Sequence, residues 1–192
     1  LSKNSKLKIK NVNINTSRIG IIKILNMMGD KIKNKKKKKY KGELIGDIFV
    51  KSRQKLKAIK LDPSLNSAAI DEFLLIFLVA SKCDGISSFK KLSELNKKES
   101  KRFDWGFKIL KMMGIETIKT KNFGIKIKGN AQLELKNTYI IKNYLKDHRI
   151  FMVSTIAALT FGGDWKIYDP DSFKTSFPTF LKTLKYLGAK IK

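Results

Sequence analysis

Three segments of the chain repeat the same order of features: an amphipathic helix pattern, a glycine and a short apolar stretch. The segments are residues 22–32, 108–116 and 181–191, and their glycines stand at 29, 114 and 188. Glycine readily adopts the left-handed conformation that ends helices, so each segment predicts a surface helix, a stop and a strand. Such a repeat restricts the fold to similar units packed against one another.

Two strongly apolar helices are predicted between the repeated segments, over residues 68–83 and 147–159. A helix that is apolar on nearly all sides is buried. The chain then alternates surface, buried, surface, buried and surface helices. We therefore expect an α/β architecture of repeated units, with the buried helices inside and the sheets outside. A closed threefold arrangement needs one more buried helix before residue 1, so the N-terminus is expected to lie inside a repeat.

Strands and turns are predicted between the helices from apolar alternation and turn residues. A run of five lysines at 35–39 is expected to be a solvated loop, because five like charges repel one another. A further strand is expected to start at Ile32. The other predicted strands cover residues 7–14, 47–50, 56–61, 86–89, 116–120, 123–128, 139–141 and 165–168.

The net charge of +26 first suggests a nucleic-acid partner. Almost all of the cations are lysines, however, and they are spread along the whole chain together with many Ile and Asn. This pattern fits a coding bias for these residues equally well, and the aromatic residues lie on apolar helix faces rather than within the basic run. We expect no nucleic-acid partner, and a basic nucleic-acid-binding domain stays the alternative from another class.

Chain length, cysteine usage and hydropathy indicate the general class of protein. The 192 residues correspond to one domain, or most of one. A single cysteine, Cys83, excludes a disulfide within the chain and a cysteine-based zinc site, and its place near a helix end favours a packed thiol. The longest uncharged run, 150–163, is too short to span a membrane, and residues 1–20 lack the apolar core of a signal peptide. We expect a cytoplasmic protein with no membrane partner.

Residues 94–102 place a lysine, a carboxylate and an arginine just before an amphipathic helix pattern. If Lys98 lies in the first helical turn, Arg102 lies one turn further along the same face. Two cations at the positive end of a helix form a site for a doubly charged anion such as a phosphate ester, and Glu99 beside them is placed to move protons. The alternative is a charged helix start on a lysine-rich surface.

Other helix starts also carry polar residues, among them Arg18, Lys174 and Asp71. Five helix N-termini on similar units are expected to point toward one place, which suits a multiply anionic ligand. Asp71 is either a helix cap or a base kept from bulk water. His148 is either structural or a hydrogen-bond donor to substrate. No zinc spacing, Walker loop or dinucleotide glycine fingerprint occurs in the sequence, so we expect neither a metal nor a cofactor.

Six motifs, in chain order, resemble the 5-enolpyruvylshikimate-3-phosphate synthase family. They are Asn-x-x-Arg-x-Gly at 15–20, Ile-Asp-Glu-Phe at 70–73, Glu-Leu-x-x-Lys-Glu-Ser-x-Arg at 94–102, Asp-His-Arg-Ile-x-Met at 147–152, Ser-Phe-Pro-x-Phe at 176–180 and Leu-Gly-Ala-Lys-Ile at 187–191. The resemblance implies an enolpyruvyl transferase-like inverse α/β barrel, with two domains of three βαβαββ units and the active site between them. This chain resembles the C-terminal domain, truncated at its N-terminus, with units at roughly 1–62, 63–135 and 136–192.

The same resemblance implies an activity. The family transfers the enolpyruvyl group of phosphoenolpyruvate to the 5-hydroxyl of shikimate 3-phosphate and releases phosphate, by addition and then elimination through a tetrahedral intermediate. By motif position, Asp71 is the base at the 5-hydroxyl. Glu99 is the acid that protonates the methylene carbon and later takes that proton back.

The implied substrate-binding residues are Lys98, Arg102, Arg149 and His148. Lys98 would contact shikimate 3-phosphate, the two arginines would hold phosphoenolpyruvate, and His148 would be an auxiliary donor. Guanidinium groups suit this task because they bind carboxylate and phosphate with two parallel hydrogen bonds. The implied partner is the missing N-terminal domain of the same chain. The full-length enzyme is expected to be a monomer, and the fragment alone to be nearly inactive.

The sequence departs from the family pattern at a few positions. Asn96 stands where the family usually has Arg, Lys101 where it has Asp, and Leu74 where it has Pro. Many members carry a lysine at the position of Thr175, whereas here Lys174 lies one residue earlier, so no binding role is assigned to either. The nearest enzyme alternative is the related UDP-N-acetylglucosamine enolpyruvyl transferase, although the motifs at 94–102 and 147–152 fit the shikimate enzyme better.

Overall fold

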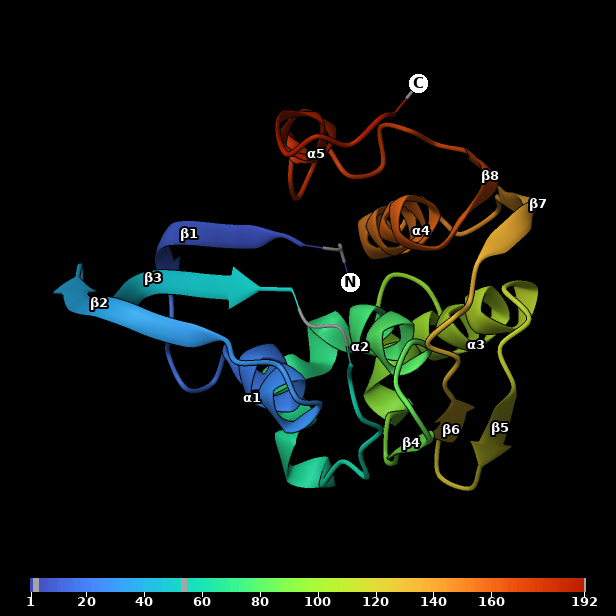
Figure 1. Ribbon diagram of the computed structural model, residues 1–192, viewed down its shortest axis with the longest axis horizontal. Helices are drawn as coiled ribbons and strands as arrows, with labels where there is room; N and C mark the ends of the chain where they lie inside the picture. The colour runs from blue at the N-terminus through green and yellow to red at the C-terminus, as the bar shows by residue number, and fades with distance from the viewer. Residues whose placement is uncertain (2–3, 53–54, 192) are drawn as a thin grey trace.

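Three α-helices pack against one another in the middle of the molecule: α2 (Phe73–Ala80), α3 (Arg102–Met112) and α4 (His148–Phe161) (Figure 1). The structure is a computed structural model that describes residues 1, 4–52 and 55–191. Helices α1 (Gly20–Met27) and α5 (Phe180–Tyr186) lie further out. Small sheets surround the central helices, which confirms the predicted α/β architecture with buried helices inside and sheets outside.

The strands form three sheets around these helices. The first sheet is antiparallel, in the order β1 (Lys6–Asn13), β3 (Glu43–Lys51) and β2 (Lys33–Tyr40). The second is also antiparallel, in the order β4 (Ile86–Phe89), β6 (Gly124–Lys128) and β5 (Thr117–Thr120), and β5 and β6 confirm the strands predicted over 116–120 and 123–128. The third is the parallel pair β7 (Leu135–Ile141) and β8 (Gly162–Ile167), whose connection contains α4.

Helix α2 is buried on nearly all sides, as its composition predicts. The rings of Phe73, Phe77 and Phe89 contact one another with centroids 5.6–6.0 Å apart. Helix α3 approaches α2 closely because Gly106 has no side chain: a Cβ there would lie 2.9 Å from atoms of Leu74 and Phe77. This close packing holds the beginnings of α2 and α3 next to each other, which matters for the polar residues located there.

Glycines follow the surface helices, as the repeat predicts. Gly29, Gly114 and Gly188 have φ angles of +99°, +73° and +96° just after α1, α3 and α5. Strands β2 and β5 come after the first two of these glycines. The described residues 189–191 form no strand, so this part of the prediction is wrong. A strand needs a neighbouring strand to pair its backbone groups, and none of the described strands pairs with this segment.

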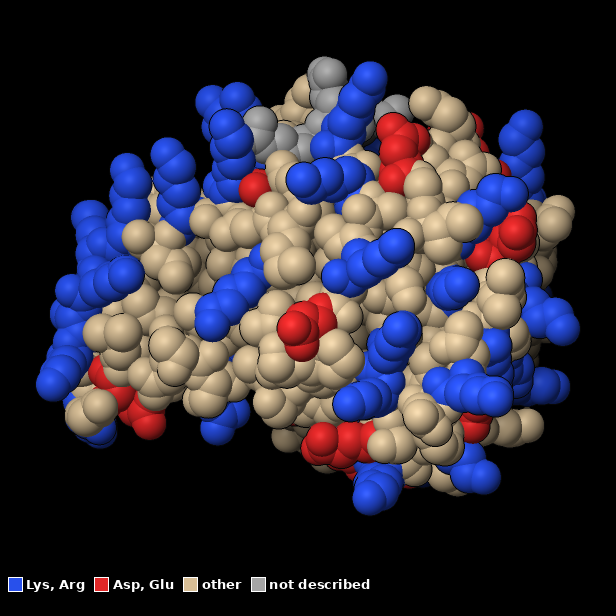
Figure 2. Space-filling model, turned by 90° about the horizontal axis from the view of Figure 1, so that it is seen from below, with Lys and Arg blue, Asp and Glu red and all other residues tan. Residues whose placement is uncertain are grey.

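The lysine run at 35–39 lies in strand β2, so the predicted loop is wrong. β2 pairs with β3, which supplies backbone hydrogen bonds, and the register shifts between Lys35 and Lys38 around a left-handed Lys36 (φ +53°). The lysine side chains are exposed on this edge strand and spread into water, as Figure 2 shows at the left end of the molecule. Repulsion between solvated charges is weak enough for backbone pairing to win, and lysines also protect an exposed sheet edge.

The first buried helix is shorter than predicted. Residues 67–72 form a 3-10 helix, η2 (Ser67–Glu72), and regular α-helix begins only at Phe73. Ala69 leaves helical geometry, with φ −136°. Next to it, Gly20 of α1 packs so closely that a Cβ there would lie 2.4 Å from the backbone of Ala68.

Residues 56–61, which were expected to form a strand, make only two isolated bridges, from Lys57 to Asp84 and from Lys60 to Ser88. Between the bridges, the amide of Ile59 donates to the side-chain oxygen of Ser87 at 3.3 Å instead of to a backbone carbonyl. A side chain therefore takes the place of a regular ladder bond in this segment.

The thiol of Cys83 is fully buried, which confirms the prediction of a packed cysteine. Burial raises its pKa to about 12, and the charge of Asp84 adds to the effect. Within the described ranges, no helix is both long and apolar enough to cross a bilayer.

Candidate active site

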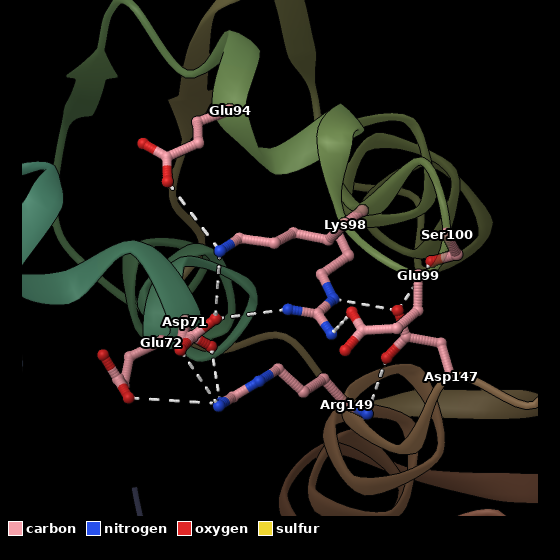
Figure 3. Close-up of polar contacts among 9 residues, drawn as sticks. Asp71, Glu72, Glu94, Lys98, Glu99, Ser100, Asp147 and Arg149 are labelled. Atoms are coloured by element: carbon pink, nitrogen blue, oxygen red, sulfur yellow. Dashed lines mark hydrogen bonds and ion pairs between the residues drawn. The ribbon is translucent and has the colours of Figure 1, made fainter.

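A cluster of charged side chains lies where three separate elements begin or end (Figure 3). Asp71 and Glu72 come from the end of η2, and Arg149 comes from the first turn of α4. Lys98 and Glu99 come from the segment that joins η3 (Ser93–Lys97) to α3. The packing of α2, α3 and α4 therefore brings together residues that lie up to 78 positions apart in the sequence.

Lys98 does not lie in a helical turn, so its predicted placement is wrong. It follows η3 in extended geometry (φ −87°, ψ −172°), and α3 begins only at Arg102. The two cations still meet, because both approach the same oxygen of Asp71. Lys98 Nζ lies 3.9 Å from Asp71 Oδ1, and Arg102 Nη1 lies 3.2 Å from it.

Arg102 is the centre of the cluster, with only 2% of its side chain exposed. Its Nε donates to Asp147 Oδ2 at 2.8 Å, its Nη1 donates to Asp71 Oδ1 at 3.2 Å, and its Nη2 donates to Glu99. The three partners differ in accessibility: the side chain of Asp147 is 0% exposed, that of Asp71 40% and that of Glu99 57%. The guanidinium therefore has one fully buried edge and one edge that faces accessible carboxylates.

Asp147 joins the start of α3 to the start of α4. Its Oδ1 caps α4 by accepting from the backbone amide of Arg149 at 2.9 Å, while its Oδ2 also accepts from Ser100 Oγ at 2.9 Å. Burial acts to raise the pKa of this carboxyl, but its hydrogen bonds and the charge of Arg102 outweigh burial and lower the pKa. Asp147 is thus an ionised carboxylate in the interior, stabilised by a cation and by N–H and O–H donors.

Asp71 is not a helix cap, so that interpretation of its sequence position is wrong. Helix α2 has no side-chain cap hydrogen bond, and the Asp71 carboxylate faces cations instead. Arg149 Nη2 lies 3.3 Å from Asp71 Oδ2, and Arg149 Nη1 donates to the Asp71 backbone carbonyl at 2.9 Å. Beside it, burial raises the pKa of Glu72, against the opposing charge of Arg149.

His148 lies half-buried in the first turn of α4, between Asp147 and Arg149. Burial lowers the pKa of its imidazole, and the positive charge of Arg149 lowers it further. A neutral imidazole is therefore favoured at pH 7, and such a ring can donate one hydrogen bond and accept another.

The predicted meeting of five helix starts is only partly correct. The structure brings together the start of α2, the start of α3 and the start of α4. Lys174, before α5, pairs locally with Asp171 at 2.8 Å. Arg18 contributes to the electrostatic surroundings of Glu72 but makes none of the ion pairs of the cluster within the described residues.

Three members of the cluster, Glu72, Ser100 and Asp147, are not among the site residues predicted from sequence. Asp147 carries a usable signal, since an aspartate just before an apolar helix is a typical N-cap, but nothing local predicts its contact with Arg102. The unusual Asn96 also has a local role. Its Oδ1 accepts from the amide of Phe103 at 2.9 Å, and its Nδ2 donates to Asp104 at 2.9 Å, so it stabilises the start of α3.

This arrangement suits the binding of an anion and the transfer of protons. Lys98, Arg102 and Arg149 offer N–H donors around Asp71, and Asp71 and Glu99 are accessible carboxylates on the same guanidinium. Fixed cations stabilise negative charge better than mobile water does, because they need no reorganisation. Within the described ranges, no group of three or more His, Cys, Asp or Glu residues has a metal-binding arrangement.

The fold resembles that of a solved enolpyruvyl transferase. It is similar to the enolpyruvyl transferase NikO from Streptomyces tendae, with a TM-score of 0.69 over 98% of this chain and 40% of that one. At 15% identity, this likeness shows the fold alone. A sequence model of the family EPSP synthase (3-phosphoshikimate 1-carboxyvinyltransferase) matches residues 1–184, so the chain belongs to the EPSP synthase family.

Relatives in this family agree closely in sequence and structure. A solved EPSP synthase from Acinetobacter baumannii superposes with a TM-score of 0.91 at 31% identity, over 100% of this chain and 43% of that one. The 3-phosphoshikimate 1-carboxyvinyltransferases of Thermodesulfovibrio yellowstonii and Ruthia magnifica are 36% and 37% identical over 95% and 96% of this chain. The chain spans 41% of the length of each of these two relatives.

Proposed function

We propose that this chain is the C-terminal domain of an enzyme that transfers the enolpyruvyl group of phosphoenolpyruvate to the 5-hydroxyl of shikimate 3-phosphate and releases phosphate. One observation carries the proposal beyond family membership. Asp71 and Glu99, which come from different elements, both contact the buried guanidinium of Arg102, and Asp71 also contacts Lys98 and Arg149. An anion bound by these cations lies next to two carboxylates that can move protons.

The two accessible carboxylates take the proton-transfer roles in this proposal. Asp71 removes the proton of the 5-hydroxyl as that oxygen attacks C2 of phosphoenolpyruvate, and Glu99 protonates the methylene carbon. In the elimination step, Glu99 takes a proton back from the methyl group as phosphate leaves. Their side-chain exposures of 40% and 57% support these roles, because an acid or base must reach its substrate.

The cations hold the two anionic substrates. Arg102 and Arg149 bind the carboxylate and phosphate of phosphoenolpyruvate, and Lys98 contacts shikimate 3-phosphate. Arginine suits bidentate binding, whereas lysine acts as a point charge. His148 is an auxiliary donor, a role supported by the lowered pKa that favours a neutral ring. Fixing two negatively charged molecules beside each other offsets their mutual repulsion.

We further propose that a second domain completes the active site and that the complete enzyme is a cytoplasmic monomer. The chain spans 41% of the length of the T. yellowstonii relative, which supports a site shared with residues beyond this sequence. Three units, at roughly 1–62, 63–135 and 136–192, make up the present domain in this proposal. The 192 residues alone are then expected to bind anions but to turn over substrate very slowly, if at all.

The test is phosphate release by the full-length product of the gene that encodes these residues. Release should require both phosphoenolpyruvate and shikimate 3-phosphate. Asp71→Asn and Glu99→Gln should each lower turnover by about 10²–10⁴-fold, the usual size of acid–base contributions. Asp171→Asn is the matched control, because Asp171 is exposed and pairs only locally with Lys174.

Two outcomes would reject the proposal or its details. A folded full-length protein that releases no phosphate with shikimate 3-phosphate, yet does so with UDP-N-acetylglucosamine, belongs to the alternative enolpyruvyl transferase activity. Near wild-type turnover in Asp71→Asn or Glu99→Gln rejects the role of that carboxylate.

A further inference from the structure

Asp147 uses its two oxygens for two different tasks. Oδ1 accepts from the backbone amide of Arg149 and so caps α4, while Oδ2 accepts from Arg102 Nε and Ser100 Oγ. Capping a helix requires only one oxygen, and a serine or asparagine does it equally well. The second oxygen therefore needs a separate explanation, because a buried carboxylate is costly unless it gains specific partners.

The contact with Arg102 fixes the orientation of the guanidinium. A guanidinium donates from its Nε side and from its outer Nη side, and here Asp147 holds the Nε side at 2.8 Å in the interior. The Nη groups then have to face Asp71 and Glu99, which are far more exposed. An anion that arrives from solvent can take the place of the Glu99 carboxylate on Nη2 without disturbing the buried contact.

We infer that Asp147 is a positioning residue that aims the outer edge of Arg102 at the bound anion and ties it to the α4 helix start, where Arg149 lies. The identity of the anion as phosphoenolpyruvate rests on the proposed function, whereas the positioning role does not. Ser100 assists by donating a hydrogen bond to the same carboxylate oxygen. Anion affinity should therefore depend on Asp147, which lies behind Arg102 on its buried side.

The decisive variant is Asp147→Ser, because it separates the two tasks. Serine keeps a capping oxygen for α4 but is too short to reach Arg102 Nε. Asp62→Ser is the matched control: Asp62 also caps a helix, through the amide of Ser64 at 2.8 Å, but it is exposed and outside the cluster. Ser100→Ala is a milder variant, which removes one donor and leaves the ion pair in place.

Binding of inorganic phosphate and of phosphoenolpyruvate to the 192-residue chain is measured by NMR titration. We expect Asp147→Ser to weaken both affinities about tenfold or more, the usual effect of losing a charge-assisted hydrogen bond. Ser100→Ala should weaken them by about threefold. Asp62→Ser should leave them unchanged. Unchanged phosphate affinity in a folded Asp147→Ser chain overturns the inference.

The second measurement is the rate at which the Nε–H proton of Arg102 exchanges with water. It needs no ligand, and it can be made on the mild Ser100→Ala variant if Asp147→Ser is of low stability. Arginine occurs only at positions 18, 53, 102 and 149, so the Nε–H signal of Arg102 can be assigned by its loss in Arg102→Lys. In the wild type this proton should exchange slowly with water. In Asp147→Ser and, to a lesser degree, Ser100→Ala it should exchange faster. A purely structural role would lower stability without changing this signal in the mild Ser100→Ala variant, and that result also overturns the inference.

The two proposals fail in different ways. If the full-length protein shows no shikimate-dependent turnover while phosphate affinity still depends on Asp147, the proposed function is wrong and the positioning role stands. If turnover occurs but Asp147→Ser changes neither the phosphate affinity nor the exchange of the Arg102 Nε–H proton, the positioning role is wrong and the proposed function stands.

Discussion

The first sheet and the Arg102 cluster are both dense in charge, but they accommodate it in opposite ways. In the sheet, the lysines of β2 are exposed, and the nearby ion pair of Lys8 with Asp47, at 3.1 Å, is an exception. In the cluster, Arg102 is buried and has three carboxylate partners. Solvated like charges cost little, whereas a buried charge persists only with partners of opposite sign. Burial with specific pairing, and not the number of charges, therefore distinguishes the site.

The two regions should differ most in how much stability is lost when a cation is replaced by an uncharged residue. Arg102→Met should destabilise the chain by about 3–5 kcal/mol, because it leaves the buried Asp147 carboxylate without its counter-ion. Lys37→Met, in the exposed sheet edge, should change stability by less than about 0.5 kcal/mol. Urea unfolding followed by circular dichroism measures both. Equal effects of the two substitutions would mean that the buried, paired Arg102 contributes no more to stability than an exposed lysine does.

The next effect concerns the packing that holds the cluster together. Gly106→Leu should destabilise by about 1–3 kcal/mol, since any side chain there meets Leu74 and Phe77 and pushes α3 away from α2. The same substitution should weaken phosphate binding, because Arg102 and Asp71 move apart. Lys111→Leu, at an exposed position of the same helix, is the control and should do neither. An unchanged affinity for phosphate would show that the cluster tolerates movement of α3.

The pH dependence of stability gives a smaller effect, but it tests the buried ion pair of Asp147 and Arg102 specifically. The pKa of Asp147 is lowered in the folded chain, so its stabilisation is complete above the unfolded pKa of about 3.9 and is lost as pH falls through the folded value. Asp147→Asn should therefore flatten the decrease in unfolding free energy below about pH 4. Asp62→Asn, which removes an exposed carboxyl with a lowered pKa, is the comparison and should flatten the curve less. If unfolding free energy falls with the same slope below pH 4 in the wild type and in Asp147→Asn, the buried carboxylate of Asp147 does not stabilise the fold as an ion.

The smallest effect is expected in the lysine sheet. Replacing Lys37, Lys38 and Lys39 by Gln should stabilise the chain by about 0.3–0.5 kcal/mol at low salt, and the gain should fade as salt screens repulsion. The control removes the same charge from scattered exposed positions, Lys121, Lys136 and Lys190. An equal gain in the control would mean that net charge matters and local crowding does not.

Patterns within one element predicted much of this structure. The period of apolar residues indicated α3, and the apolar composition of 147–159 indicated α4. The glycines at 29 and 114 marked helix ends followed by strands. The same patterns failed where a distant contact decided the conformation. The lysine run became a strand because β3 lies beside it, and the segment from Ser67 to Glu72 forms a 3-10 helix where Gly20 of α1 packs against Ala68.

The candidate site shows the same division. The motif resemblance proposed Asp71, Lys98, Glu99, Arg102 and Arg149 as site residues, and the structure brings these five side chains together in one cluster. The motifs did not predict how the side chains are arranged. The idea that Lys98 and Arg102 share a helix face was wrong, because the chain between them is extended and turns into α3 only at Arg102.

Local periodicity and residue type were thus sufficient to predict the alternation of surface and buried helices, because this pattern depends on neighbours a few positions away. Tertiary packing alone decided that Asp147 lies behind Arg102, that Asp71 faces cations and caps no helix, and which edge of the guanidinium is accessible. The physical reason is that a buried charge is stable only beside partners of opposite sign, and two of the three carboxylates on Arg102 lie 31 and 45 positions away in the chain.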